Sequence, residues 1–174
     1  MSYDNLVWAE NIPNNLKSWV TDFFSAADEK GEESACKFSE CFAEDGNMEG
    51  MIGLLPGRKG MLRIGTAGFH ARGEVLAFSA DKGPRTAIHG SRLRAWDAVE
   101  TRKHILYKVY SLGQAPCEIL ILGKLESSLK NGKSFEMEFA AQAVFQTPVG
   151  DRPKAASYRI WAVSFAWTRH SRMG

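Results

Sequence analysis

The chain has 174 residues with 22 basic and 20 acidic side chains, a formal charge of +2. This length suits one compact domain, which we expect to span residues 1–174, and the charge gives no electrostatic signature for a nucleic-acid partner. The composition, 44% hydrophobic and 24% charged, excludes a disordered chain. The sequence lacks both a bilayer-spanning apolar run and a signal peptide pattern, so we expect no membrane partner and a cytoplasmic location.

Three helices are predicted in the first part of the chain. Pro13 and the two asparagines after it form a start signal, apolar residues then recur at helical spacing, and Gly31 ends the segment. A second, shorter helix is expected over residues 32–42, and a third over roughly 85–101. The four arginines and lysines at 92, 94, 102 and 103 are read as a solvated face.

From residue 102 the pattern changes to β-structure. Runs of apolar and β-branched residues, separated by Gly, Pro and Asn turns, predict four strands over residues 102–112, 117–129, 133–146 and 156–165. Helices followed by a meander of long strands indicate an α+β domain, with helices packed on one face of an antiparallel sheet.

The pair Asn131-Gly132 predicts a two-residue type I′ turn between two of these strands. Counting outward places Leu125 opposite Glu138, unless a β-bulge swaps the partners. One face then carries Glu136, Glu138, Gln142, Gly123 and Ala140. Small residues opposite one another leave room, so this face is a candidate ligand pocket; alternatively, Glu136 is solvated and Glu138 pairs with a basic residue.

Both faces of the predicted sheet are largely apolar, which indicates that both are covered. Helices can cover one face. A second copy of the chain is the simplest cover for the other, so we expect a homodimer, with Phe135, Phe139 and Phe145 as candidates for the contact surface.

Five phrases resemble the SnoaL-like branch of the nuclear transport factor 2-like (NTF2-like) superfamily, in particular short fungal SnoaL-like proteins. They are WVTDFFSAAD (19–28), FSECFAEDG (38–46), RLRAWDAVETRKH (92–104), LGKLESSLKNGKSFEMEFAAQAVF (122–145) and YRIWA (158–162). The resemblance implies a cone of three helices in a strongly curved antiparallel sheet, with a pocket inside and dimerisation through the outer face. Residues 47–87 and the tail 163–174 depart from the family's pattern, the former as an atypical loop or insertion.

Characterised members of this superfamily include cofactor-free polyketide cyclases, ketosteroid-isomerase-like isomerases, dehydratases and epoxide hydrolases, while others only bind ligands or partners. Such isomerases need a group that moves a proton and a donor for the resulting enolate oxygen. We therefore predict His104 and Glu138 as the proton-transfer groups, Tyr107 as the oxyanion donor and Asp45 as a further acid near the cavity. Three of them also have a structural reading: surface or core histidine, paired acid and turn aspartate. Tyr107 shares a face of its strand with Ile105 and Val109, so we expect it to be buried.

The predicted substrate is a small, mostly apolar, polyketide- or terpenoid-like molecule. Its candidate contacts are Trp19, Phe23, Phe42, Trp96, Gln142 and Trp161, although aromatic residues at helical spacing are core more often than ligand contacts. No nucleotide-binding, serine-hydrolase or metal motif occurs, and the three cysteines match no metal spacing, so we expect no cofactor. The alternative to an enzyme is a non-catalytic ligand-binding or dimeric scaffold domain.

Overall fold

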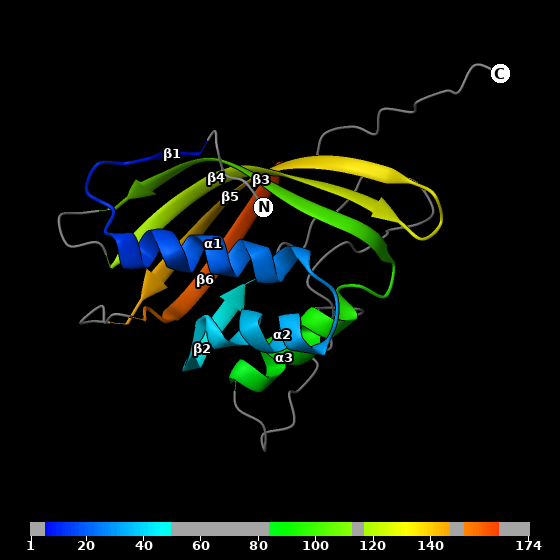
Figure 1. Cartoon of the computed structure of the whole chain (residues 1–174), viewed down its shortest axis with the longest axis horizontal. Coiled ribbons are helices and arrows are strands. Elements are labelled where there is room, and N and C mark those ends of the chain that lie inside the picture. The colour runs from blue at the N-terminus through cyan, green and yellow to red at the C-terminus, as the bar shows by residue number, and fades with distance from the viewer. Residues whose placement is uncertain (1–5, 50–83, 113–116, 147–151, 164–174) are drawn as a thin grey trace.

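A computed structural model gives the structure and describes residues 6–49, 84–112, 117–146 and 152–163 (Figure 1). This part of the chain contains three helices, α1 (Asn14–Asp28), α2 (Glu32–Glu40) and α3 (Pro84–Arg94). It also holds six strands, β1 (Val7–Trp8), β2 (Phe42–Glu49), β3 (Val99–Ser111), β4 (Glu118–Leu129), β5 (Ser134–Phe145) and β6 (Ala155–Val163). Most of the atypical segment 47–87 and of the tail 163–174 lies outside the described residues.

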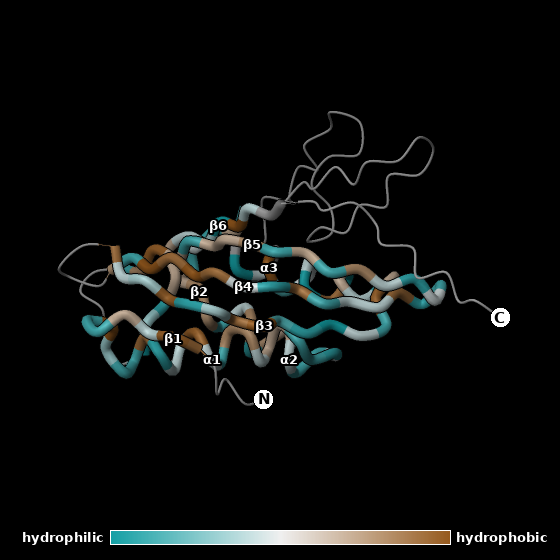
Figure 2. Tube along the Cα trace, turned by 90° about the horizontal axis from the view of Figure 1, so that it is seen from above, coloured by the Kyte–Doolittle hydropathy of each residue, from teal (hydrophilic) through white to brown (hydrophobic). Residues whose placement is uncertain are grey.

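The six strands form one mixed sheet in the order β1-β3-β4-β5-β6-β2. Its four long strands, β3 to β6, pair antiparallel as predicted, whereas the edge strands β1 and β2 run parallel to β3 and β6. These two edge strands were not predicted, because one is two residues long and the other lies in a polar stretch. Figures 1 and 2 show α1 and α2 on one side of the curved sheet, which makes an α+β cone.

Helix α1 confirms the predicted first helix. Pro13 occupies the N-cap position without a side-chain cap hydrogen bond, and two buried rows run along the helix towards the sheet. Helices α2 and α3 are shorter than predicted, since Phe42 already begins β2 and the chain turns at Ala95 to Asp97 before β3. The buried rows of α1 are Leu16, Val20, Phe24 and Asp28, and Trp19, Phe23 and Ala27.

The core lies between the helices and the inner face of the sheet. Phe23 is at its centre, with the rings of Trp19, Phe24, Phe38 and Tyr158 all within 5.1 Å of its own, measured between centroids. Burying each such side chain contributes roughly 1.5–3 kcal/mol. The sheet contributes fully buried residues from its central strands, namely Val109, Ile119, Ile121, Ala141 and Ala143.

The hairpin between β4 and β5 corrects the predicted register by one residue. Its loop has three residues rather than two: Leu129 donates its N–H to the carbonyl of Lys133 at 2.7 Å, and Gly132, at a φ of 78°, donates to the carbonyl of Leu129 at 2.9 Å. Leu125 therefore faces Met137 and not Glu138. Because side chains alternate, this shift of one residue separates Glu138 from the predicted pocket partners.

The same alternation explains where the predicted phenylalanines lie. Phe139 and Phe145 are buried in the core rather than on an outer surface, and Phe135 packs against a small cluster of Trp96, Val99 and Leu129. The prediction that these three residues form the outer contact surface is therefore wrong. The register error accounts for it, since it exchanged the two faces of β5 relative to β4.

Candidate functional site

A buried aspartate ends the apolar face of α1. Asp28 follows Val20 and Phe24 at intervals of four residues, so the helix directs it towards the sheet, and its side chain is 0% exposed. A carboxylate is electrostatically unfavourable at a helix C-terminus, where the dipole is negative. An acid held there and removed from water needs strong partners.

His104 on β3 supplies both partners. Its backbone N–H donates to Oδ2 of Asp28 at 2.7 Å, and its ring nitrogen Nδ1 lies 2.5 Å from Oδ1. The imidazole packs between the rings of Phe24 and Phe139, at centroid distances of 5.0 and 5.6 Å. The His104 side chain keeps 10% exposure, whereas the Asp28 side chain has none.

Two arginines and a tryptophan lie beside the pair. Arg92, only 4% exposed, donates from Nη2 to the carbonyls of Ala26, Ala27 and Glu29, which flank Asp28 at the end of α1. Arg102 is two residues before His104 on β3 and donates to the carbonyl of Ala95 at 3.2 Å. The guanidinium carbons of Arg92 and Arg102 lie 5.1 and 5.0 Å from the centre of the Trp96 ring.

These charges set the protonation of the histidine. Burial lowers the pKa of His104, the nearby Arg102 and Arg92 lower it further, and the hydrogen bond and charge of Asp28 oppose the change. The net direction is down, so the imidazole is neutral at pH 7. Oδ1 of Asp28 accepts a hydrogen bond from Nδ1–H of His104. This contact fixes the imidazole proton on Nδ1 and leaves Nε2 as the basic nitrogen.

The arrangement of helices and sheet matches solved structures. A protein with a ketosteroid isomerase-like fold from Catenulispora acidiphila, in complex with trimethylamine, aligns with a TM-score of 0.54 at 14% identity, covering 82% of this chain and 83% of that one. This chain has the NTF2-like fold. No protein-family model matches the sequence, and no curated protein matches it.

Two further structures of similar fold are named after enzymes. A candidate SnoaL-like polyketide cyclase from Shewanella denitrificans aligns with a TM-score of 0.53 at 8% identity, covering 87% of this chain and 92% of that one. A candidate scytalone dehydratase from Novosphingobium aromaticivorans aligns with a TM-score of 0.54 at 8% identity, covering 87% and 83%. At these identities the likeness concerns the fold.

Three of the four residues predicted for the chemistry lie away from Asp28. Glu138 is exposed on β5 opposite Lys124, on the other face of the sheet from His104. Tyr107, predicted to be buried, is 41% exposed, because a β-bulge between Leu106 and Lys108 breaks the alternation on which that prediction relied. Asp45 is exposed on β2 and accepts a hydrogen bond from Gln146 at 3.5 Å.

The residues predicted to contact substrate divide into three groups. Trp19, Phe23 and Phe42 pack on one another in the core, where the indole N–H of Trp19 donates to the carbonyl of Cys41 at 2.9 Å. Gln142 bonds to Glu118, and Trp161 is 46% exposed, both on the outer face of the sheet. Trp96 alone of the six lies with the arginines next to the Asp28–His104 pair.

Asp28, Arg92 and Arg102 were missed as site residues, and the prediction of a solvated basic face is wrong for Arg92. A signal for two of them was present in the sequence. Asp28 continues the apolar row of α1, and Arg92 lies midway between Ile88 and Trp96 at intervals of four residues. A charged residue in the apolar row of a helix is a candidate for function, because its burial needs a compensating partner.

The described residues show neither a metal cluster nor a membrane-spanning helix. Within them, no group of three or more His, Cys, Asp or Glu is placed to hold a metal ion. In the same part of the chain, no helix is both long enough and apolar enough to cross a bilayer.

Proposed function

We propose that this chain is a cytoplasmic SnoaL-like protein that moves a proton on a small enolisable carbonyl compound, as a cofactor-free isomerase, cyclase or dehydratase. The observation that carries the proposal is the Asp28–His104 pair, in which a buried carboxylate orients an imidazole through a 2.5 Å contact at Nδ1. The names of similarly folded proteins, a candidate polyketide cyclase and a candidate scytalone dehydratase, agree with a polyketide- or terpenoid-like substrate.

In the proposed reaction His104 is the general base. Nε2 removes a proton from the carbon next to the substrate's carbonyl, and the electron pair moves onto the carbonyl oxygen to give an enolate. The histidine becomes an imidazolium, which the Asp28 carboxylate stabilises across the Nδ1 hydrogen bond. Returning the proton to another carbon isomerises the substrate, and returning it to a leaving hydroxyl group dehydrates it.

Asp28 replaces Glu138 as the partner of His104 in this proposal. The predicted pair cannot act together in the described arrangement, because the two side chains lie on opposite faces of the sheet. Tyr107 and Asp45 also leave the proposed machinery, since both are exposed and neither contacts His104 among the described residues.

A non-catalytic ligand-binding or scaffold domain is the second candidate. The observation in its favour is that Trp19, Phe23 and Phe42, predicted to line a pocket, fill the core by packing on one another. Under this function, Asp28 and His104 tie α1 to β3 and have no chemical task. The two candidates therefore differ in whether His104 exchanges protons with a bound ketone.

Deuterium exchange distinguishes the two candidates without knowledge of the product. A panel of polyketide- and terpenoid-like ketones is incubated in D2O with the wild type, His104→Gln and the matched control His89→Gln, and deuterium next to the carbonyl is followed by mass spectrometry. We expect exchange in the wild type and the control, and a decrease of about 100-fold or more in His104→Gln. Ketone binding without exchange in the wild type would favour the scaffold.

We also propose a homodimer through the outer face of the sheet. A row across its four long strands consists of Lys108, Leu122, Ala140 and Trp161, so it is apolar at its centre and ends in an exposed indole. A second copy would cover this row. Sedimentation of Leu122→Glu against the wild type tests it: a dimer that dissociates in the variant supports the proposal, and a wild-type monomer at micromolar concentration contradicts it.

A further inference from the structure

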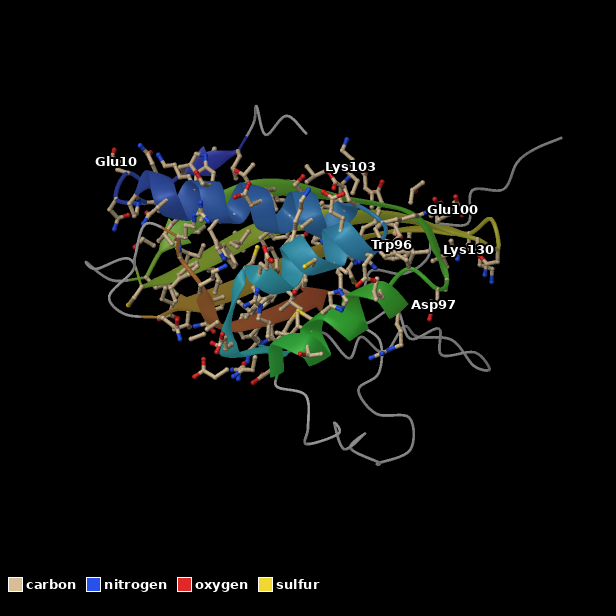
Figure 3. The ribbon with its side chains drawn as sticks, turned by 60° about the horizontal axis from the view of Figure 1, so that its bottom comes forward. Glu10, Trp96, Asp97, Glu100, Lys103 and Lys130 are labelled. Atoms are coloured by element: carbon tan, nitrogen blue, oxygen red, sulfur yellow. The ribbon has the colours of Figure 1, made fainter. Side chains whose placement is uncertain are left out.

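Four buried side-chain nitrogens near His104 lack hydrogen-bond partners among the described residues. They are Nε and Nη1 of Arg92, Nε1 of Trp96 and Nε of Arg102. All belong to one group, because both guanidinium carbons lie within 5.1 Å of the centre of the Trp96 ring. Figure 3 shows Trp96 at the end of the molecule where α3 leads into β3. Buried donors without an acceptor are rare in native proteins, so this group calls for an explanation.

Hydrogen bonds to backbone carbonyls account for only one nitrogen, Nη2, of each of these two arginines. Nη2 of Arg92 satisfies carbonyls at the end of α1, and Nη2 of Arg102 satisfies the carbonyl of Ala95. If the arginines had only a structural role, we would expect all their buried N–H groups to be paired within the protein. Nε and Nη1 of Arg92, Nε of Arg102 and the indole N–H of Trp96, which is 9% exposed, stay available for an acceptor.

The group also carries excess positive charge. Arg92 and Arg102 face one acid, Asp28, whose charge acts on both of them, and Lys30, 5.4 Å from the Trp96 ring, is already paired with Glu100 at 3.6 Å. Burial lowers the pKa of Arg92 to about 9, with a contribution from Arg102, so Arg92 is still charged at neutral pH. Two cations, the buried Arg92 and the half-buried Arg102, against one anion favour a second anion in the same place.

We propose that Arg92, Arg102 and Trp96 form a subsite for an anionic oxygen of the ligand, either a carboxylate or the oxygen of an enolate. Arg102 and His104 lie on the same face of β3, two residues and therefore about 7 Å apart along the strand. A ligand carboxylate bound there would lie some distance from the carbon that exchanges its proton, whereas an enolate oxygen is only two bonds from that carbon. This placement relative to the reaction rests on the proposed function, whereas anion binding itself does not.

Matched probes test the subsite by binding alone. Calorimetric titration compares 2-naphthoate with the neutral 2-naphthamide on the wild type, Arg102→Gln and the control Lys103→Gln, which removes an exposed positive charge one position away. We expect the wild type and the control to prefer the carboxylate by about tenfold or more, and Arg102→Gln to lose this preference. Equal binding of both probes by the wild type, binding of neither, or an equal loss in both variants would overturn the proposal.

A third probe separates the two sources of the oxygen. Bound 2-naphthol that shows the absorption of the naphtholate ion assigns the subsite to an enolate-like oxygen, and bound 2-naphthol that stays neutral, together with a preference for naphthoate, assigns it to a carboxylate. If Arg102→Gln does not fold by circular dichroism, Trp96→Phe replaces it, since this change removes the indole N–H and keeps an aromatic ring. A reduced preference for naphthoate is then expected, and an unchanged one counts against the subsite.

Failure of the subsite and failure of the proposed function give different results. His104→Gln removes proton exchange with the ketone panel but is expected to retain the preference for naphthoate. A preference for naphthoate without exchange by the wild type would leave the subsite standing and overturn the enzymatic proposal. Exchange without any preference for naphthoate would support the enzymatic proposal and overturn the subsite.

Discussion

Asp28 accepts two hydrogen bonds from the same residue, His104, one from its backbone N–H and one from its imidazole. The two contacts fix the ring in position and orientation, and they join the end of α1 to β3 across 76 residues of sequence. Both oxygens of the carboxylate are occupied in this way. The pair therefore has a structural role whether or not the histidine transfers protons, and the two roles need separate tests.

Asp28→Asn is expected to damage both stability and activity. An amide has one acceptor oxygen, so only one of the two N–H groups of His104 keeps its acceptor. The other contact survives only if the imidazole proton moves to Nε2 and Nδ1 accepts from the amide, which removes the basic nitrogen. We expect the free energy of unfolding to fall by about 2–4 kcal/mol. If the variant folds, proton exchange should fall by about 10²–10⁴-fold, because the amide no longer stabilises the imidazolium. Urea unfolding measures the stability, with exposed Glu29→Gln as the control, which should change it by less than about 0.5 kcal/mol.

The lowered pKa of His104 predicts a loss of stability in mild acid. The unfolded chain takes up a proton at this histidine near its ordinary pKa of about 6.5, whereas the folded chain takes it up only at lower pH. The contribution is therefore complete above about pH 6.5 and decreases as the pH falls, by at most about 1.4 kcal/mol per pH unit. Unfolding measured from pH 7.5 to 5 should show a slope that His104→Gln reduces. An NMR titration that places the pKa of His104 above 6.5 would contradict this.

Gly123 on β4 is expected to tolerate no side chain. An added Cβ would lie 2.7 Å from the carbonyl oxygen of Ile105 and 2.9 Å from Cζ of Phe139. Gly123→Ala should lower the free energy of unfolding by about 1–3 kcal/mol through this overpacking. The control is Gly90→Ala in α3, where the nearest atom is Nη1 of Arg94 at 3.5 Å and alanine favours the helix by about 0.5–1 kcal/mol. Chemical denaturation measures the change in the free energy of unfolding for both variants. Changes of opposite sign support the close packing at Gly123, and equal changes would contradict it.

The cysteines should differ sharply in reactivity. Burial raises the pKa of the Cys41 thiol to about 12, so almost none of it is thiolate at pH 8, while Cys36 is exposed on α2. Iodoacetamide should label Cys36 in the native protein and reach Cys41 only after unfolding in urea. Peptide mass spectrometry gives the labelled positions, with the urea sample as the control. Native labelling of Cys41 at a rate like that of Cys36 would show that the core around it opens.

Hydrophobic periodicity was sufficient to predict the helices and long strands. The apolar spacing of residues 16–27 and the β-patterned runs after residue 102 are local signals, and both correspond to elements of the structure. The resemblance to SnoaL-like proteins indicated how these elements assemble into an α+β cone. Edge strands β1 and β2 escaped prediction because their pairing depends on distant residues, such as Lys108 for Val7 and Tyr158 for Met48.

The sequence by itself determined which segments are helix or strand, and it singled out His104. The tertiary structure decided what His104 faces. One added residue in the loop at Asn131-Gly132 and one bulge at Tyr107 changed the faces of Glu138 and Tyr107, because side chains in a strand alternate at every residue. Asp28 lies on α1 and Arg92 on α3, so only the folded chain brings them to Arg102 and His104 on β3.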